Sequence, residues 1–259
     1  MELNVDIPGM KPTHPSHHVR HMGIGTGVYK SLGHLVLTLV IVVLPFLFFL
    51  LFSKAAKLAT GELFADVFIS VGRLFFAYAI AAGLGWLLAV SFYHGRRASV
   101  ALPVFDVLQS FPTFALLPLV TLLWGKSELT IVFFLVITII WPIFFTVVSQ
   151  LKLLKSEWQE VVTVYGLSGK DYLKYYLWPA SLPGLITGSI IGLGEGWEAL
   201  VATEIIVNHP VGLGSFFQNN SLHPVLTAVG IFGLLLLIFC VNKLIWLPLL
   251  EWSHKRSEE

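Results

Sequence analysis

Charge is the scarcest feature of this sequence. Only 12% of the 259 residues are Asp, Glu, Lys or Arg, whereas 56% are hydrophobic and the mean hydropathy is +0.82. So few charged side chains could not cover this much apolar surface in a water-soluble protein. The composition therefore excludes a soluble enzyme and predicts a chain that lies mainly in a lipid bilayer.

Cysteine and basic charge are also scarce. The single cysteine, Cys240, lies in an apolar run and can form no disulfide within the chain, so it does not indicate a redox compartment. A formal net charge of +1 supplies no basic surface for nucleic acid. We therefore expect no disulfide framework and no nucleic-acid partner.

Sequence motifs for nucleotide binding, metal binding and hydrolysis are missing as well. Gly125-Lys126-Ser127 resembles the end of a phosphate-binding loop, but that pattern requires glycine where the chain has Val120. The sequence has no His-Glu-x-x-His, no Gly-x-Ser-x-Gly and no paired cysteine motif. We expect no catalytic residue, no metal site and no cofactor bound by this chain.

Long apolar runs are abundant. A helix of about 20 residues crosses the roughly 30 Å of hydrocarbon in a bilayer, and by this criterion the sequence predicts an all-α polytopic protein with six transmembrane helices. The prolines of the third run predict that it is broken or kinked, and Trp141-Pro142 stands near the end of the fourth. The six runs lie near residues 32–52, 67–91, 103–124, 129–149, 182–207 and 224–250.

The two ends of the chain are polar. Residues 1–30 have neither the short apolar core nor the cleavage site of a signal peptide, so we expect a disordered polar tail. Residues 31–252 form the predicted transmembrane domain, and residues 253–259 form a second tail. The histidines of the first tail allow two interpretations, a metal-binding segment or a disordered His-rich terminus: His14, His17, His18 and His21.

The distribution of Lys and Arg predicts the orientation. With both termini in the cytoplasm, the outer loops hold only Lys54, Lys57 and Lys126. The same orientation places residues 150–181, the one long hydrophilic connection, in the cytoplasm. The basic residues on the inner side are Lys11, Arg20, Lys30, Arg96, Arg97, Lys152, Lys155, Lys170, Lys174, Lys255 and Arg256.

The connection at 150–181 is predicted to contain two short helices. Residues 157–165 form the first, which ends at Gly166 because glycine accepts the left-handed conformation common after a helix. Ser168 and Asp171 have the spacing of a capping box for the second helix. The apolar stripe of this second helix consists of Tyr172, Leu173, Tyr176 and Leu177. Pro179 and Pro183 are expected to end it. Such a pair of helices could bind a groove on another protein or lie on lipid headgroups, and both interpretations stay open.

The order of residues in this connection resembles a known family. Glu160-Val161-Val162 is followed by Gly166 four residues later, then by Trp178-Pro179 and Leu182-Pro183-Gly184. This resembles the Glu-Ala-Ala, Gly and Leu-Pro elements of the integral membrane permeases of binding-protein-dependent ABC importers, with Val in place of both Ala.

Other segments resemble the nitrate/sulfonate/taurine branch of that family. They are Pro103 to Asp106, Phe111-Pro112, Leu117-Pro118-Leu119, Trp124-Gly125, Trp141-Pro142-Ile143, Glu204 and Gly212-Leu213-Gly214. The first tail and the first predicted span show no comparable match.

The resemblance implies a type I permease fold in a bacterial or archaeal plasma membrane. It implies a homodimer, two ABC ATPase subunits that hold ATP and Mg²⁺, and an external substrate-binding protein near residues 208–223. The cytoplasmic segment would be the coupling loop that docks on the ATPase, through Glu160, Gly166, Leu167, Ser168, Gly169, Lys170, Asp171 and Tyr172. A nitrate-, sulfonate-, taurine- or bicarbonate-type anion would be the substrate.

Five charged residues stand at predicted bilayer depth, where each costs at least about 2.5–3.5 kcal/mol without a partner. They are the candidates for the translocation path: Arg73, Asp106, Glu195, Glu198 and Glu204. Arg73 could instead form a structural ion pair, since Asp66 lies two turns before it and Asp106 lies on the next predicted span.

Glycine recurs at every fourth residue of the fifth predicted span, at Gly184, Gly188, Gly192 and Gly196. This spacing predicts close packing against another helix or an open path. At 100° per residue, Glu195 falls among the glycines, Glu198 about 80° to one side and Glu204 nearly opposite.

Glu195 and Glu198 leave the substrate open. They could lock helices together or line the path, and as ionised path residues they would repel anions and favour a cationic, zwitterionic or neutral solute such as a vitamin precursor. An intramembrane enzyme with these two residues as acid and base lacks a nucleophile and metal ligands. A passive channel would not need the coupling segment.

Overall fold

The computed structural model describes residues 60–154 and 164–258, together with residue 162 and isolated positions between 40 and 54. The chain divides into two units, residues 1–44 and 45–259. The N-terminal histidines, most of the first predicted span, Glu160 and most of the helix predicted at 157–165 lie outside the described residues.

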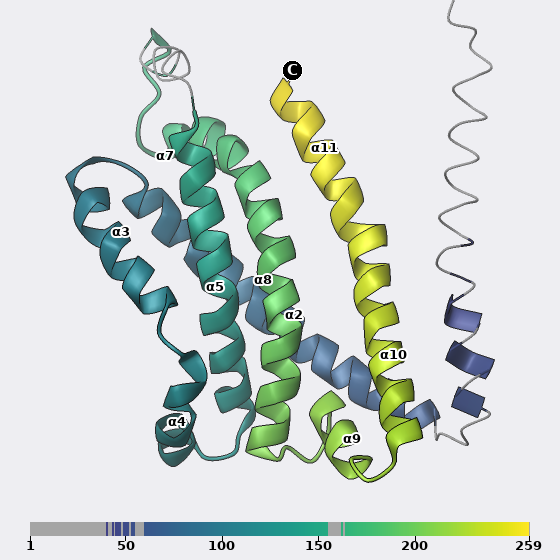
Figure 1. The fold of residues 1–259 in the computed structure, drawn as a ribbon. Coiled ribbons are helices and arrows are strands. Elements are labelled where there is room, and N and C mark those ends of the chain that lie inside the picture. The colour runs from purple at the N-terminus through teal and green to yellow at the C-terminus, as the bar shows by residue number, and fades with distance from the viewer. Residues whose placement is uncertain are drawn as a thin grey trace, which may run out of the picture. The chain divides into compact units, whose positions relative to one another are not determined.

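Three helices form the centre of the unit at 45–259: two run side by side, and the third crosses behind them (Figure 1). Apolar runs with few charges produce each of them, and their facing sides bury large aliphatic and aromatic side chains completely, among them Leu74, Ile139 and Phe144. The three are α2 (Thr60–Phe92), α5 (Glu128–Lys152) and α8 (Trp178–Val207).

The third predicted span is broken, as its prolines indicated. It consists of α3 (Gly95–Gln109), the 3₁₀ turn η1 (Thr113–Leu116) and α4 (Leu117–Trp124). The two halves meet at an angle of 74°. Pro112 precedes η1 and cannot continue the hydrogen-bond ladder of α3, so the break falls between Gln109 and Thr113.

Helical structure continues through Pro179 and Pro183, so the prediction that these prolines end the helix is wrong. The one-turn α7 (Gly169–Tyr172) leads into the π-helical turn η2 (Leu173–Leu177), and η2 leads directly into α8. Pro179 falls in the first turn of α8, where a missing N–H is tolerated. Ser168 is the N-cap of α7 as predicted, but its side chain makes no capping hydrogen bond.

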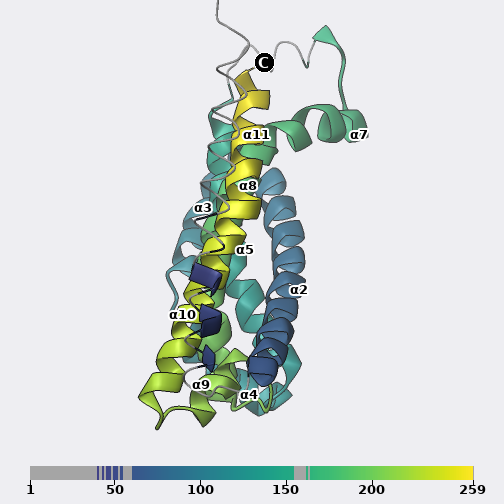
Figure 2. The same ribbon diagram turned by 90° about the vertical axis from the view of Figure 1, so that its right-hand side faces the viewer.

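The last predicted span is longer than expected. It runs from α10 (Pro224–Val241) through the π-helical turn η3 (Asn242–Trp246) into α11 (Leu247–Glu258). Between α8 and α10, the short α9 (Leu213–Asn219) lies beside the end of α8, while α7 lies at the opposite end of the bundle (Figure 2). These ends are called the α9 end and the α7 end.

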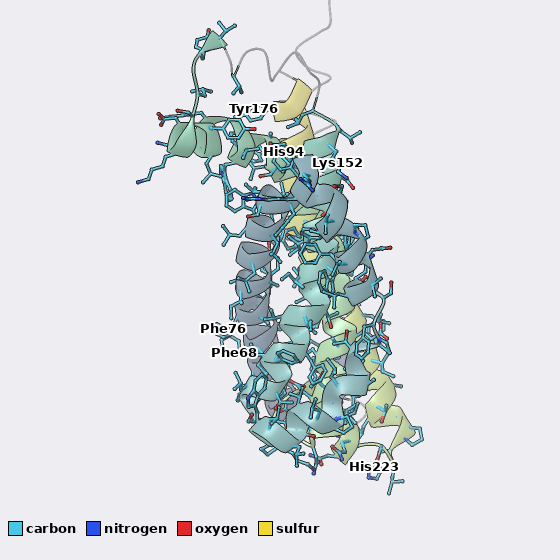
Figure 3. All side chains as sticks on the ribbon, turned by 90° about the vertical axis from the view of Figure 1, so that its left-hand side faces the viewer. Phe68, Phe76, His94, Lys152, Tyr176 and His223 are labelled. Carbon is cyan, nitrogen blue, oxygen red and sulfur yellow. The ribbon has the colours of Figure 1, made fainter. Side chains whose placement is uncertain are left out.

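The outer face of α2 is strongly apolar. Phe68 and Phe76 project from it with 80% and 62% of their surface exposed (Figure 3). Large exposed aromatics of this kind are suited to lipid or to another helix. Three described helical segments are long and apolar enough to cross a membrane, or four if the bent pair counts as one span. The predicted count of six therefore stays a prediction.

The glycine stripe of α8 faces α5. A Cβ atom at Gly184 would lie 2.8 Å from the carbonyl oxygen of Thr146, and one at Gly192 would lie 3.0 Å from that of Ile139. At Gly188, a Cβ would fall on the hydroxyl of Thr146 and 2.6 Å from Ile143 Cα. The absence of side chains along this stripe lets the two backbones approach closely.

Candidate functional site

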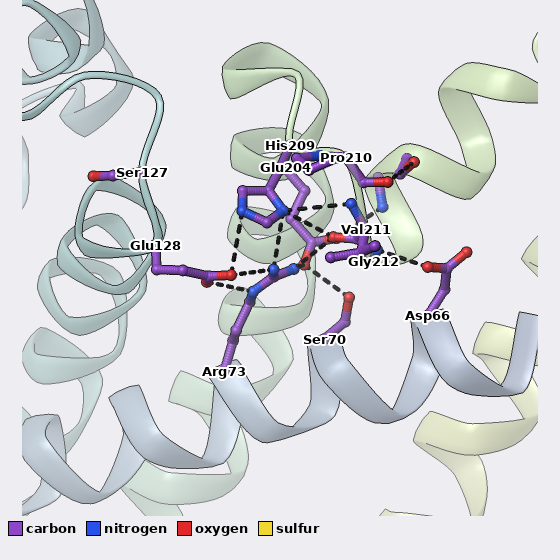
Figure 4. Close-up of polar contacts among 12 residues, drawn as sticks. Asp66, Ser70, Arg73, Ser127, Glu128, Glu204, His209, Pro210, Val211 and Gly212 are labelled. Atoms are coloured by element: carbon purple, nitrogen blue, oxygen red, sulfur yellow. Dashed lines mark hydrogen bonds and ion pairs between the residues drawn. The ribbon is translucent and has the colours of Figure 1, made fainter.

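Arg73 is the centre of a buried polar network at the α9 end (Figure 4). Its side chain is only 5% exposed, and α2 directs it toward the end of α8 and the start of α5. The network, called the Arg73 network below, joins α2, α5, α8 and the segment before α9. Its members are Asp66, Ser70, Arg73, Glu128, Glu204, His209, Val211 and Gly212.

Four of the five N–H donors of the Arg73 guanidinium have an oxygen acceptor, and the fifth faces a ring nitrogen of His209. Glu128 accepts from Nε at 2.6 Å and also from Nη2, which makes a two-point ion pair. Nη1 donates to Glu204 at 2.6 Å and to the carbonyl of Val211 at 2.9 Å, and Nη2 also lies 3.0 Å from His209 Nδ1. Only arginine has enough donors in a planar arrangement to satisfy this site.

Glu204 is fully buried and accepts three hydrogen bonds. The donors are the Ser70 hydroxyl at 2.7 Å, Arg73 at 2.6 Å and the backbone N–H of Gly214 at 2.8 Å. Because Gly214 belongs to α9, the carboxylate ties this short helix to α2 and α8.

The backbone that follows α8 is shaped to fit this network. Asn208 ends α8 in the left-handed conformation, with φ of 57°. Gly212 has φ of 126°, and a Cβ there would lie 2.6 Å from Arg73 Nη1 and 2.7 Å from a carboxylate oxygen of Glu204. Its N–H donates to Asp66 at 2.8 Å. Glycine is therefore required both by conformation and by space.

The sequence did not identify all partners of Arg73. Neither Asp66 nor Asp106 is paired with it: Asp66 accepts from Gly212, and Asp106 is exposed on α3 and accepts from Gln109. Glu128 and His209 were not among the predicted site residues. Glu128 could have been noticed, because it follows Ser127, whose side chain caps α5.

A cavity of about 340 Å³ lies along α5 and α8, next to the break between α3 and η1. Glu195 lines it, whereas Glu198 is exposed but is not among the lining residues. Arg73 and Glu204 belong to the buried network and do not line this cavity. The cavity, called the α5–α8 cavity below, is lined by Gln109, Thr113, Thr138, Trp141, Pro142, Phe145, Thr146, Ile191 and Glu195.

Aromatic side chains connect α7 and α8 to the C-terminal part of α2 and to Tyr93, which follows it, at the α7 end. The hydroxyls of Tyr93 and Tyr172 lie 2.9 Å apart, and Trp86 donates to the Ser181 hydroxyl at 2.8 Å. Burial, with a smaller effect of Tyr172, raises the pKa of Tyr93, and burial also raises the pKa of Tyr176. Both phenols therefore stay protonated at neutral pH, and we expect no titration of this contact there.

The described coupling residues predicted from the sequence lie in two places, a bend at Gly166 and an exposed helical turn that begins at Gly169. Gly166 and Gly169 both have positive φ, of 62° and 54°, so each marks a change in chain direction. The second predicted helix is short and exposed at Gly169, Lys170 and Asp171, whereas Tyr176 and Leu177 of its apolar stripe are buried. Leu167 is half-buried and Tyr172 faces Tyr93.

No group of three or more His, Cys, Asp or Glu side chains that could hold a metal ion occurs among the described residues. The Arg73 network is saturated by its own partners, so its evident effect is to hold helices in place. The α5–α8 cavity, which has polar side chains in its lining, is large enough to accept a small solute.

Comparison with known proteins identifies the family. Residues 81–245 match the family described as binding-protein-dependent transport system inner membrane component. The chain is 32% identical over 179 residues to the nitrate import permease protein NrtB of Synechocystis sp., an alignment that covers 66% of this chain and 65% of the relative. It is 29% identical over 182 residues to the bicarbonate transport system permease protein CmpB of Synechococcus elongatus, covering 67% and 66%.

These matches span slightly less than two thirds of the relatives' own length. The matched region nevertheless extends from the last third of α2 to η3 and includes the α5–α8 cavity and the members of the Arg73 network that follow α2. The chain belongs to the family of binding-protein-dependent transport system inner membrane components, and it is a multi-pass membrane protein.

Proposed function

We propose that this chain is the permease subunit of an ABC importer, with six transmembrane helices and both termini in the cytoplasm. The observation that supports it most is the family match over residues 81–245, a region that contains both a solute-sized cavity and the α7 segment. Two copies would form the path, two ATPase subunits would bind ATP and Mg²⁺, and an external binding protein would deliver the solute near residues 208–223.

Co-purification tests this proposal. The full chain, co-expressed with a candidate ABC ATPase and a candidate binding protein, should form a complex whose ATPase activity in lipid vesicles is stimulated by the binding protein. An unstimulated complex, or a chain that transports solute without any ATPase, would favour a channel instead.

The coupling loop is the part proposed to contact the ATPase. Gly169, Lys170 and Asp171 are exposed at the α7 end, and η2 connects them without interruption to α8. A push on α7 would therefore reach α8, which lines the α5–α8 cavity. Glu160, which lies outside the described residues, and Gly166 complete the proposed contact.

Gly166→Ala should weaken coupling. Alanine in the left-handed conformation costs about 1–2 kcal/mol, which corresponds to roughly a 5- to 30-fold loss of ATPase binding or stimulation. The measurement is binding-protein-stimulated ATPase activity in vesicles. Gly72→Ala is the matched control, because an added Cβ at Gly72, as at Gly166, would have no atom within 4 Å, but Gly72 is helical and has no positive φ. Equal activity in the two variants would remove Gly166 from the coupling element.

The relatives' names make a small anion such as nitrate or bicarbonate the first substrate class to test. The α5–α8 cavity supports the alternative of a cationic or neutral metabolite, because a carboxylate lines it.

A further inference from the structure

The α5–α8 cavity has one ionisable residue in its lining, Glu195. None of its lining residues is Lys, Arg or His. An ionised Glu195 therefore gives the wall a negative charge that no lining cation balances. Any positive charge that attracts an anion would have to lie outside the lining of the cavity.

Two of the three threonine hydroxyls in the wall are used as donors within their own helix, and the third, that of Thr113, donates to the carbonyl of Phe111 at 3.5 Å. Thr138 donates to the carbonyl of Phe134 at 2.8 Å, and Thr146 donates to that of Pro142 at 2.6 Å. A hydroxyl has one hydrogen and two lone pairs, so each of these oxygens presents only acceptor capacity to the cavity.

Gln109, which lines the cavity, is hydrogen-bonded to a second carboxylate, that of Asp106. Its amide nitrogen donates to Asp106 at 2.8 Å, which uses one of its two N–H groups and leaves its carbonyl oxygen as an acceptor. The side-chain donors that remain in the lining are the other N–H of Gln109 and the indole N–H of Trp141. Acceptors thus outnumber donors around the cavity.

This lining does not suit an oxyanion. Nitrate or bicarbonate would need N–H donors or a cation to replace its hydration, and would meet the charge of Glu195 instead. A volume of about 340 Å³ is in the range of sites for organic molecules and would be left mostly empty by a four-atom anion.

A protonated amine suits this lining better than an anion does, because it carries a positive charge and N–H donors. Its N–H groups could donate to Glu195 and to the threonine oxygens, while the faces of Trp141 and Phe145 accept a cation over the ring. We propose that the α5–α8 cavity is the passage site for a small organic cation, with Glu195 as its counter-charge. This inference rests on the proposed function as a permease.

The test uses the full chain with its ATPase and binding protein in lipid vesicles. Metabolites of a cell extract, separated by ion exchange at pH 7 into cationic, neutral and anionic fractions, are supplied outside, and nitrate and bicarbonate are supplied separately. Solutes that accumulate inside in the presence of ATP are identified by mass spectrometry. We expect accumulation from the cationic fraction.

Glu195→Gln should lower that uptake about tenfold or more, because it removes one partner of a desolvated charge pair. Glu251→Gln, which removes an exposed carboxylate from α11, is the matched control and should transport normally. Uptake from the neutral or anionic fraction, uptake of nitrate or bicarbonate, uptake from no fraction, or unchanged uptake in Glu195→Gln would overturn the substrate class. If the complex with the unmodified chain shows no ATPase activity that the binding protein stimulates, the proposed function itself is refuted.

Discussion

Arg73→Ala should cost about 3–5 kcal/mol of stability, because it leaves the fully buried Glu204 carboxylate without its counter-ion. The same change removes the two-point pair with Glu128 and the donor to Val211. Arg73→Lys should rescue little of this, since an ammonium has three donors and no planar arrangement. Unfolding of the purified chain, followed by tryptophan fluorescence during denaturant titration, measures the loss.

Glu128→Gln is the control for this prediction. Its side chain is 56% exposed, so water can replace part of its contact with Arg73 and the loss should be clearly smaller. Combining Arg73→Met with Glu204→Met removes both buried charges, and should recover much of the stability lost in Arg73→Ala. Equal losses for Glu128→Gln and Arg73→Ala would show that burial of Glu204 does not determine the effect.

Gly188→Ala should destabilise the α5–α8 pair by about 1–3 kcal/mol or more. The added methyl group would fall on the Thr146 hydroxyl and lie 2.6 Å from Ile143 Cα and 2.9 Å from the Pro142 carbonyl oxygen. Two of these three atoms belong to the backbone of α5, so no side-chain rotation can relieve the overlap, and the helices must separate.

Gly194→Ala, on the same helix, should have the opposite effect on stability. A Cβ there has no atom within 4 Å, so the change should stabilise α8 by up to about 1 kcal/mol through helix propensity alone. Denaturant titration of both variants measures the pair. The same sign of effect at positions 188 and 194 would contradict the close approach of α5 and α8.

The stripe of glycines shows how much of the packing could be predicted from the sequence. A spacing of four residues defines one face of a helix, so Gly184, Gly188 and Gly192 indicated a close helix contact. The periodicity could not say which helix is the partner. That partner is α5, whose backbone lies against the glycines in the tertiary structure.

The helix boundaries show a similar limit. Proline residues correctly indicated the break before η1, where Pro112 interrupts the chain. They led to a wrong stop at Pro179, because a proline in the first helical turn removes an N–H that has no partner within the helix anyway. Local chemistry alone does not distinguish a proline that ends one helix from a proline that begins the next.

Scarcity of charge was sufficient to determine the environment, since 56% hydrophobic residues with 12% charged residues require a bilayer. The residue order of the connection at 150–181 and the sequence Gly212-Leu213-Gly214 also pointed to the family without any coordinates. The partners of the few intramembrane charges were decided by tertiary structure alone. Arg73 meets Glu128 and Glu204, 55 and 131 residues away, because α2, α5 and α8 converge at the α9 end, and no local spacing encodes that convergence.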